Sequence, residues 1–71
     1  MKIVYGDHAR RRMKQRGVED WEIEYVLKHP SYIKKSFDGR KIAIGDIKNR
    51  GLKIIFIEEE SYIKVISVMF L

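Results

Sequence analysis

Hydrophobic residues recur at two different intervals in the two halves of this 71-residue chain. Residues 7–29 carry the three- and four-residue spacing of amphipathic helices, whereas residues 31–71 alternate or run apolar, as strands do. No repeat, low-complexity segment or linker separates the two halves. Residues 1–71 are therefore expected to form a single domain with one shared core.

The first half predicts two helices, of which the first runs from Asp7 to about Arg16. Asp7 is the expected N-cap, and Gly17 is a natural C′ residue that ends the helix. At 100° per residue, Ala9 and Met13 point in the same direction and form a narrow apolar stripe.

The second predicted helix begins after Val18 and ends before Pro30, which cannot continue a helix. With Glu19 as N-cap, Glu22 falls at N3 and completes a capping box. The apolar positions that should face the core are Ile23, Val26 and Leu27.

The second half predicts four strands, at residues 32–37, 40–47, 52–58 and 62–70. The turns are expected at Asp38-Gly39, at residues 49–51 and at residues 59–61, and such short connections favour an antiparallel meander. Residues 2–5 are a further short strand candidate. The predicted fold is α+β, with two N-terminal helices packed on one face of a four-stranded antiparallel sheet.

Charge and composition narrow the range of possible functions. Fifteen Lys and Arg residues against ten Asp and Glu give a net charge of +5, which favours an anionic partner, above all nucleic acid. The absence of cysteine excludes thiolate metal sites and disulfides, and the two histidines fall on different predicted helices, so neither a metal site nor a cofactor is expected. Without a signal peptide or a transmembrane run, the chain is expected to be a cytoplasmic protein that does not bind membranes.

Residues 7–16 hold the most informative side chains. His8, Arg12 and Arg16 form a ridge beside the apolar stripe, while Arg10 and Lys14 lie on the far side and are interpreted as solvated charges. An imidazole can act as general base or acid, and a guanidinium can grip phosphate, so His8 and Arg12 are candidate catalytic residues for RNA cleavage without a metal.

Simpler roles remain open for both residues. A single histidine near a helix start often caps or packs, and Arg12 would be structural if it were buried against a sheet carboxylate such as Asp46. The candidate nucleic-acid contacts are the remaining basic residues of the first helix and of the strands and turns: Arg11, Arg16, Arg40, Lys48, Arg50 and Lys64.

Two further pairs stand out because of their surroundings. Lys64 and Ser67 interrupt an otherwise apolar strand, and simple alternation places them on opposite faces. Trp21 and Tyr25, four residues apart, lie opposite the core face of the second helix. They are the predicted interface with a partner protein or a second copy, unless the rings fold back onto the monomer.

The motif His8-Ala9-Arg10-x-Arg12-Met13-x-x-Arg16-Gly17-Val18, followed by an acid-rich helix and Pro30, resembles a small bacterial and archaeal family of unknown function. That family is similar in layout to BrnT-like and RelE/ParE-like toxins. The resemblance implies an RNA endonuclease, with an antitoxin as partner. By the same resemblance, Ser67 corresponds to a Ser/Thr of the closing strand and joins His8 and Arg12 as a candidate catalytic residue.

Two functions therefore remain open on the sequence. The first is a metal-independent ribonuclease of toxin type that cleaves RNA by attack of the 2′-hydroxyl on the neighbouring phosphate. The alternative is a non-catalytic module that binds nucleic acid or a partner protein through the basic first helix.

Overall fold

The computed structural model describes residues 2–71. It contains two helices and five strands in the order β1 (Lys2–Tyr5), α1 (Asp7–Arg16), α2 (Asp20–Lys28), β2 (Tyr32–Lys35), β3 (Arg40–Ile47), β4 (Arg50–Glu58) and β5 (Tyr62–Phe70). Neither described helix is long and apolar enough to cross a membrane.

The strands form one mixed sheet in the order β1-β5-β4-β3-β2. Strands β2 to β5 make the predicted antiparallel meander, but β1 joins it by pairing parallel to β5, with Lys2 opposite Tyr62. The prediction of a four-stranded antiparallel sheet was therefore wrong, although the α+β class holds. The short strand expected at residues 2–5 is confirmed, but its place in the sheet was not predicted, because its partner lies about 60 residues away in the sequence.

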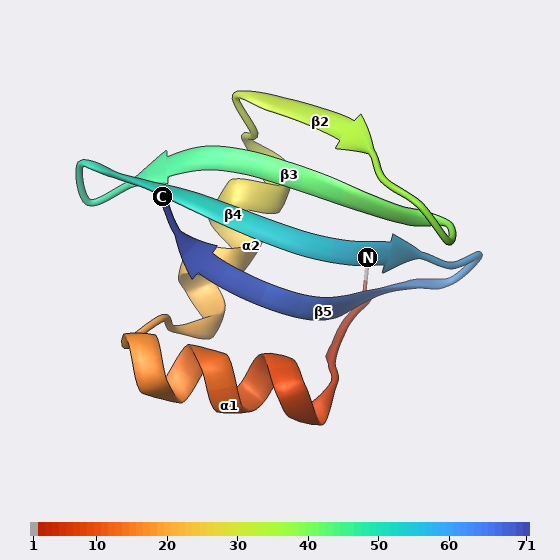
Figure 1. Cartoon of the computed structure of the whole chain (residues 1–71), viewed down its shortest axis with the longest axis horizontal. Helices are drawn as coiled ribbons and strands as arrows, with labels where there is room; N and C mark the ends of the chain where they lie inside the picture. Colours follow the sequence, from red (N-terminus) through yellow and green to blue (C-terminus); the bar gives the residue numbers. More distant parts are fainter. Residues whose placement is uncertain (1) are drawn as a thin grey trace.

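Both helices lie toward one side of the sheet. In Figure 1, α2 passes behind β3 and β4 while α1 runs along β5, and the near face of the sheet carries no helix. The core between helices and sheet contains the predicted stripe residues Ala9 and Met13, with Ile23 and Val26 of α2. A side chain at Gly45 would place its Cβ 3.0 Å from Val26 Cγ1, so this glycine allows α2 to lie close against β3.

The predicted helix ends are largely confirmed. Glu19 is the N-cap of α2 with Glu22 in a reciprocal capping box, and Gly17 adopts the left-handed conformation after α1. The N-cap of α1 is Gly6 rather than Asp7, which instead becomes the first helical residue. At this position the carboxylate of Asp7 still interacts favourably with the positive, N-terminal end of the helix dipole.

Two tight turns connect β2, β3 and β4. Asp38 and Gly39 both have positive φ, as the predicted hairpin turn requires. The next turn is Lys48-Asn49, also with positive φ at both residues, and not residues 49–51. Strand β4 consequently starts two residues earlier than predicted, and β2 ends two residues earlier, at Lys35.

A β-bulge changes the side-chain alternation of β5. Ile55 pairs with Ser67 and Phe56 pairs with Val65, so Ile66 is an extra residue between them. Lys64, opposite Ile57, and Ser67, opposite Ile55, therefore lie on the same face of the sheet. The prediction that they lie on opposite faces was wrong because simple alternation takes no account of a bulge.

Candidate functional site

The exposed flank of α1 brings His8 and Arg12 together. Arg12 Nε donates a long hydrogen bond of 3.5 Å to His8 Nε2, and Arg12 Nη1 donates to Gln15 Oε1 at 3.2 Å. These contacts follow from the helix, because residues four apart share one side of it. Arg12 has no carboxylate partner among residues 2–71, so the alternative pairing with Asp46 does not form.

The contact defines the chemistry available to His8. Arg12 Nε is the donor in this contact, so His8 Nε2 is positioned as the acceptor. The imidazole is solvent exposed and the guanidinium is half-buried beside it. A lone pair that can take a proton thus lies beside a cation that can bind phosphate.

The opposite flank of α1 is held by α2. Arg10 lies about 160° around the helix from Arg12 and makes two bonds to Asp20, at 2.6 and 3.3 Å. Its guanidinium also stacks on the Tyr5 ring, with 4.0 Å between Cζ and the ring centroid. Arg10 is therefore a bridge between β1, α1 and α2, and its interpretation as a solvated charge was wrong.

Tyr5 completes this bridge from β1. Its hydroxyl is buried without a hydrogen-bond partner. Burial, followed by the nearby carboxylates of Asp20 and Glu24, raises the pKa of Tyr5 to about 12, while Arg10 acts in the opposite direction. The hydrogen bond to Asp20 raises the pKa of Arg10 in turn. Both groups keep their protons at neutral pH, so the bridge is structural.

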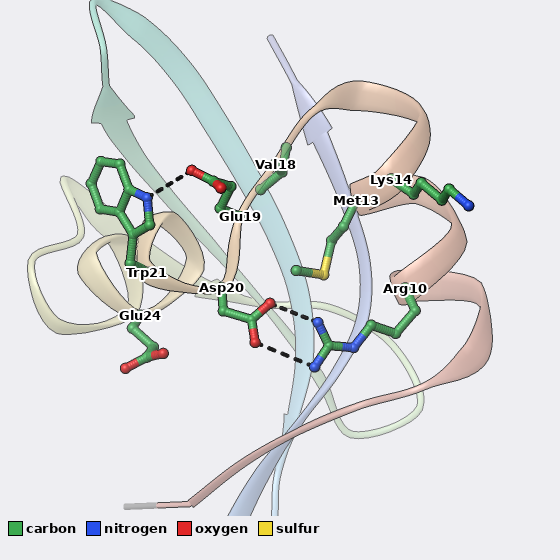
Figure 2. Close-up of a pocket in the computed structure, with 8 residues that line it drawn as sticks. All are labelled: Arg10, Met13, Lys14, Val18, Glu19, Asp20, Trp21 and Glu24. Carbon is green, nitrogen blue, oxygen red and sulfur yellow. Dashed lines mark hydrogen bonds and ion pairs between the residues drawn. The ribbon is translucent and has the colours of Figure 1, made fainter.

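A depression beside α1 lies on the flank that carries Arg10. This shallow depression of about 760 Å³ lies between α1 and α2, and Figure 2 shows Arg10 and Asp20 meeting across it. The other lining residues are Met13, Lys14, Val18, Glu19, Trp21 and Glu24. His8 and Arg12 are not among the residues that line it.

The sheet face without helices, here called the open face, carries other predicted site residues. Residues directly opposite each other in neighbouring strands share a face, so the register places Arg40, Lys64 and Ser67 on it. Lys64 reaches toward α1, since its Cε lies 3.6 Å from the position a Cβ on Gly6 would occupy. No described hydrogen bond joins Ser67 to His8 or Arg12 within residues 2–71.

The other candidate nucleic-acid contacts are dispersed. Arg11 is exposed on α1, and Arg16 is half-buried with its Nη1 lacking a partner. Lys48 lies 3.6 Å from Glu22 Oε2, and Arg50 stacks at 3.6 Å on the ring of Phe70. The six predicted residues therefore do not form one continuous surface.

Trp21 and Tyr25 lie on the outer side of α2, as predicted. They remain 50% and 46% exposed, so neither ring completes the monomer core. Trp21 Nε1 donates to Glu19 Oε2 at 3.0 Å, and the Tyr25 ring packs on His29 with a centroid distance of 5.0 Å. Their role as a partner interface remains a prediction.

Sequence reasoning missed the buried carboxylate of Glu22. Only 1% of Glu22 is exposed, and its Oε1 accepts the backbone N–H of Glu19 at 2.9 Å while Lys48 approaches Oε2. The capping-box spacing identified the first contact, but the second depends on the turn after β3. Within residues 2–71 no group of three or more His, Cys, Asp or Glu side chains is placed to hold a metal ion.

Comparison with known proteins identifies the family and the fold. Residues 5–70 match the family described as Domain of unknown function (DUF4258), and the chain therefore belongs to this family. No curated protein matches the sequence. The chain is similar to the crystal structure of the Brucella abortus ribonuclease toxin BrnT, with a TM-score of 0.77 and 22% sequence identity. The match covers 100% of this chain and 96% of the BrnT chain. At that identity the likeness shows a shared fold, as the resemblance to BrnT-like toxins implied.

Proposed function

We propose that this member of the DUF4258 family is an RNA endonuclease of toxin type. The observation that carries the proposal is the contact between Arg12 Nε and His8 Nε2 on the flank of α1 that faces away from α2. The BrnT fold supports it, because the solved protein that shares this layout is itself named a ribonuclease toxin. In the part of the chain that the structure describes, neither His8 nor Arg12 forms a side-chain hydrogen bond or ion pair outside α1.

In the proposed reaction, His8 Nε2 takes the proton of an RNA 2′-hydroxyl, and the 2′-oxygen attacks the adjacent phosphorus. The bond from phosphorus to the 5′-oxygen breaks, and that oxygen takes a proton from water, while His8 returns the proton that it accepted to the solvent. The products are a 2′,3′-cyclic phosphate and a 5′-hydroxyl. No metal takes part in these steps.

Arg12 has two successive roles in this scheme. In the free protein its Nε occupies the lone pair of His8. An incoming phosphate competes for the guanidinium, and this frees Nε2 for the 2′-hydroxyl while Arg12 stabilises the charge that develops on phosphorus. Ser67 is proposed to hydrogen-bond the same phosphate from β5.

The RNA backbone is proposed to run along α1 and to reach the open face at its β5 edge. Arg11 and Arg16 continue the basic surface along α1, and Lys64 extends it to β5. Arg40, Lys48 and Arg50 contact RNA in this proposal only if the strand continues beyond β5.

An end-group assay tests the reaction. Purified protein is incubated with a mixed-sequence RNA in EDTA, and the cleavage products are analysed for 2′,3′-cyclic phosphate and 5′-hydroxyl ends. His8→Gln is expected to reduce the cleavage rate by 10²–10⁴-fold. His29→Gln is the matched control, because His29 is the other histidine of the chain and packs on Tyr25. Equal activity of the two variants would contradict the assignment of His8.

The alternative function is a non-catalytic module that binds RNA or a partner through α1, whose exposed basic residues support it. In that case RNA stays intact, His8→Gln binds it as the wild type does, and Arg11→Glu with Arg12→Glu abolishes binding. As a toxin, the protein would also require an antitoxin, and the predicted surface for it or for a second copy is Trp21 with Tyr25.

A further inference from the structure

The open face has an apolar strip across its centre. Ile42 and Ile44 of β3 lie beside Ile55 and Ile57 of β4, with Ile42 directly opposite Ile55. Ile42 is only 9% exposed, yet it lies outside the core between helices and sheet. No helix lies on this side of the sheet (Figure 1). Ile42 must therefore be covered by neighbouring side chains of the same face. The strip is therefore an assembled apolar surface and not four isolated isoleucines.

Cations surround this isoleucine strip. In the register, Lys34 is opposite Ile42, Lys53 is opposite Ile44, and both Arg40 and Lys64 are opposite Ile57. None of these four forms an ion pair within residues 2–71, whereas Lys41 and Arg10 on the helix side do. Asp46 is the one acidic residue of β3 on this face. The face therefore combines an apolar centre with unpaired positive charge.

We propose that the open face is the docking surface for an acidic amphipathic helix of a protein partner. A helix is about 10 Å across, which matches the width of β3, β4 and β5 at ~4.8 Å per strand. Apolar residues along one side of that helix would pack on the isoleucine strip, as Ile23 and Val26 of α2 pack on the opposite face. Its Glu and Asp side chains would pair with the four surrounding cations.

The chemistry of the face favours this occupant over the two others. A second copy would bring the same cations into contact with each other, which costs free energy. RNA can pair with Lys64 at the β5 edge, as proposed above, but the isoleucine strip itself offers its bases no aromatic ring for stacking. Tyr32, exposed opposite Ile44, borders the strip without being part of it. A partner with both apolar and acidic side chains matches both features.

The test uses a designed peptide of about 18 residues, ~27 Å long as a helix. Leucine occupies positions i, i+3, i+4 and i+7, and the remaining positions are Glu and Ala. The full chain labelled with ¹⁵N is titrated with this peptide and with a matched peptide in which Lys replaces Glu. The Glu peptide is expected to shift the amide signals of β3, β4 and β5, and the Lys peptide is expected to bind at least tenfold more weakly.

Matched variants locate the interaction. Lys53→Glu with Lys64→Glu is expected to weaken binding about tenfold, whereas Lys14→Glu with Lys28→Glu on the exposed helix surfaces is expected to leave it within twofold. Trp21 fluorescence should remain unchanged, because Trp21 lies on the far side of the molecule. A Trp21 response, with equal losses in both double variants, would overturn the proposal.

Two further outcomes would assign the face to another occupant and overturn the proposal. One is a concentration-dependent shift of the same amides without peptide, which indicates a second copy. The other is a shift of the β3 and β4 amides by a short oligouridylate in the absence of peptide, which indicates that RNA covers the isoleucine strip. Because the peptide assay does not depend on RNA cleavage, an inactive His8 would leave this result unaffected.

Discussion

The two flanks of α1 carry similar basic side chains but differ in what they contact. Arg10 on one flank makes two bonds to Asp20 of α2 and stacks on Tyr5 of β1. Within residues 2–71, the side-chain hydrogen bonds of Arg12 on the other flank go to His8 and Gln15 of its own helix. The helix period separates the two arginines, and the packing of α2 then gives one of them an anionic partner.

Under the proposed function, this difference gives one short basic helix two roles, stability on the Arg10 flank and chemistry on the Arg12 flank. An arginine that is already paired with a carboxylate must lose that partner before it can bind phosphate. An arginine that hydrogen-bonds an imidazole and an amide has no carboxylate partner to lose before it binds an anion. We therefore expect substitutions on the Arg10 flank to change stability, and substitutions on the Arg12 flank to change activity.

The largest expected effect concerns activity. Arg12→Ala should reduce the RNA cleavage rate by about 10²-fold, because one donor to the developing charge on phosphorus is lost. Its free energy of unfolding should change by less than about 0.5 kcal/mol. Cleavage rates and urea unfolding of the same preparations measure both quantities.

Arg10→Ala is the matched control for Arg12→Ala. It is expected to retain cleavage within about threefold while losing stability. If both variants lost activity equally, the two flanks would not differ in function, and the assignment of Arg12 would be wrong.

The next prediction concerns the stability of α2, the helix that carries Asp20, the partner of Arg10. Glu22→Ala removes the N3 side chain of the capping box and the buried carboxylate near Lys48, and it is expected to cost about 1–2 kcal/mol of unfolding free energy. Glu24→Ala, an exposed change on the same helix, should cost less than about 0.5 kcal/mol. Urea midpoints compare the two variants, and equal midpoints would show that the buried carboxylate contributes nothing.

The sequence contained most of the local structure. Its helical spacing, Gly17, the Glu19–Glu22 capping box and the Asp38-Gly39 turn each depend on residues close together in the chain, and each was predicted. The parallel pairing of β1 with β5 depends on contacts between distant residues. So does the bulge at Ile66, and neither leaves a periodic signal.

The same distinction applies to the site. The four-residue spacing of His8 and Arg12 was sufficient to predict that they meet, because both lie on one helix. The spacing did not reveal that Arg10 has an anionic partner, since Asp20 reaches it only through the angle between α1 and α2. A helical wheel predicts on which side of α1 a residue lies. Whether a charged residue on that side has an ionic partner depends on the tertiary contacts of the helix.

A smaller effect measures the bridge directly. In a double-mutant cycle of Arg10→Ala and Asp20→Asn, the coupling free energy is expected to be about 0.5–1 kcal/mol, because both side chains are half-exposed. The same cycle for Arg12→Ala and Asp20→Asn should give no coupling above experimental error. Coupling in the second cycle would mean that Asp20 also influences the His8 flank.

The last prediction concerns the titration of Tyr5, which has the smallest effect at neutral pH because its hydroxyl stays protonated there. Its pKa is raised to about 12, first by burial of the hydroxyl and then by Asp20 and Glu24, so the folded protein holds this proton more tightly than the unfolded chain, whose tyrosine pKa is about 10. The resulting stability is fully present below pH 10 and is lost as pH rises from 10 toward 12. Absorbance of the phenolate at 295 nm should show a transition near pH 12 that Tyr5→Phe removes. Asp20→Asn should lower this pKa and His8→Gln should not, and a shift in His8→Gln would show that the two flanks are electrostatically coupled.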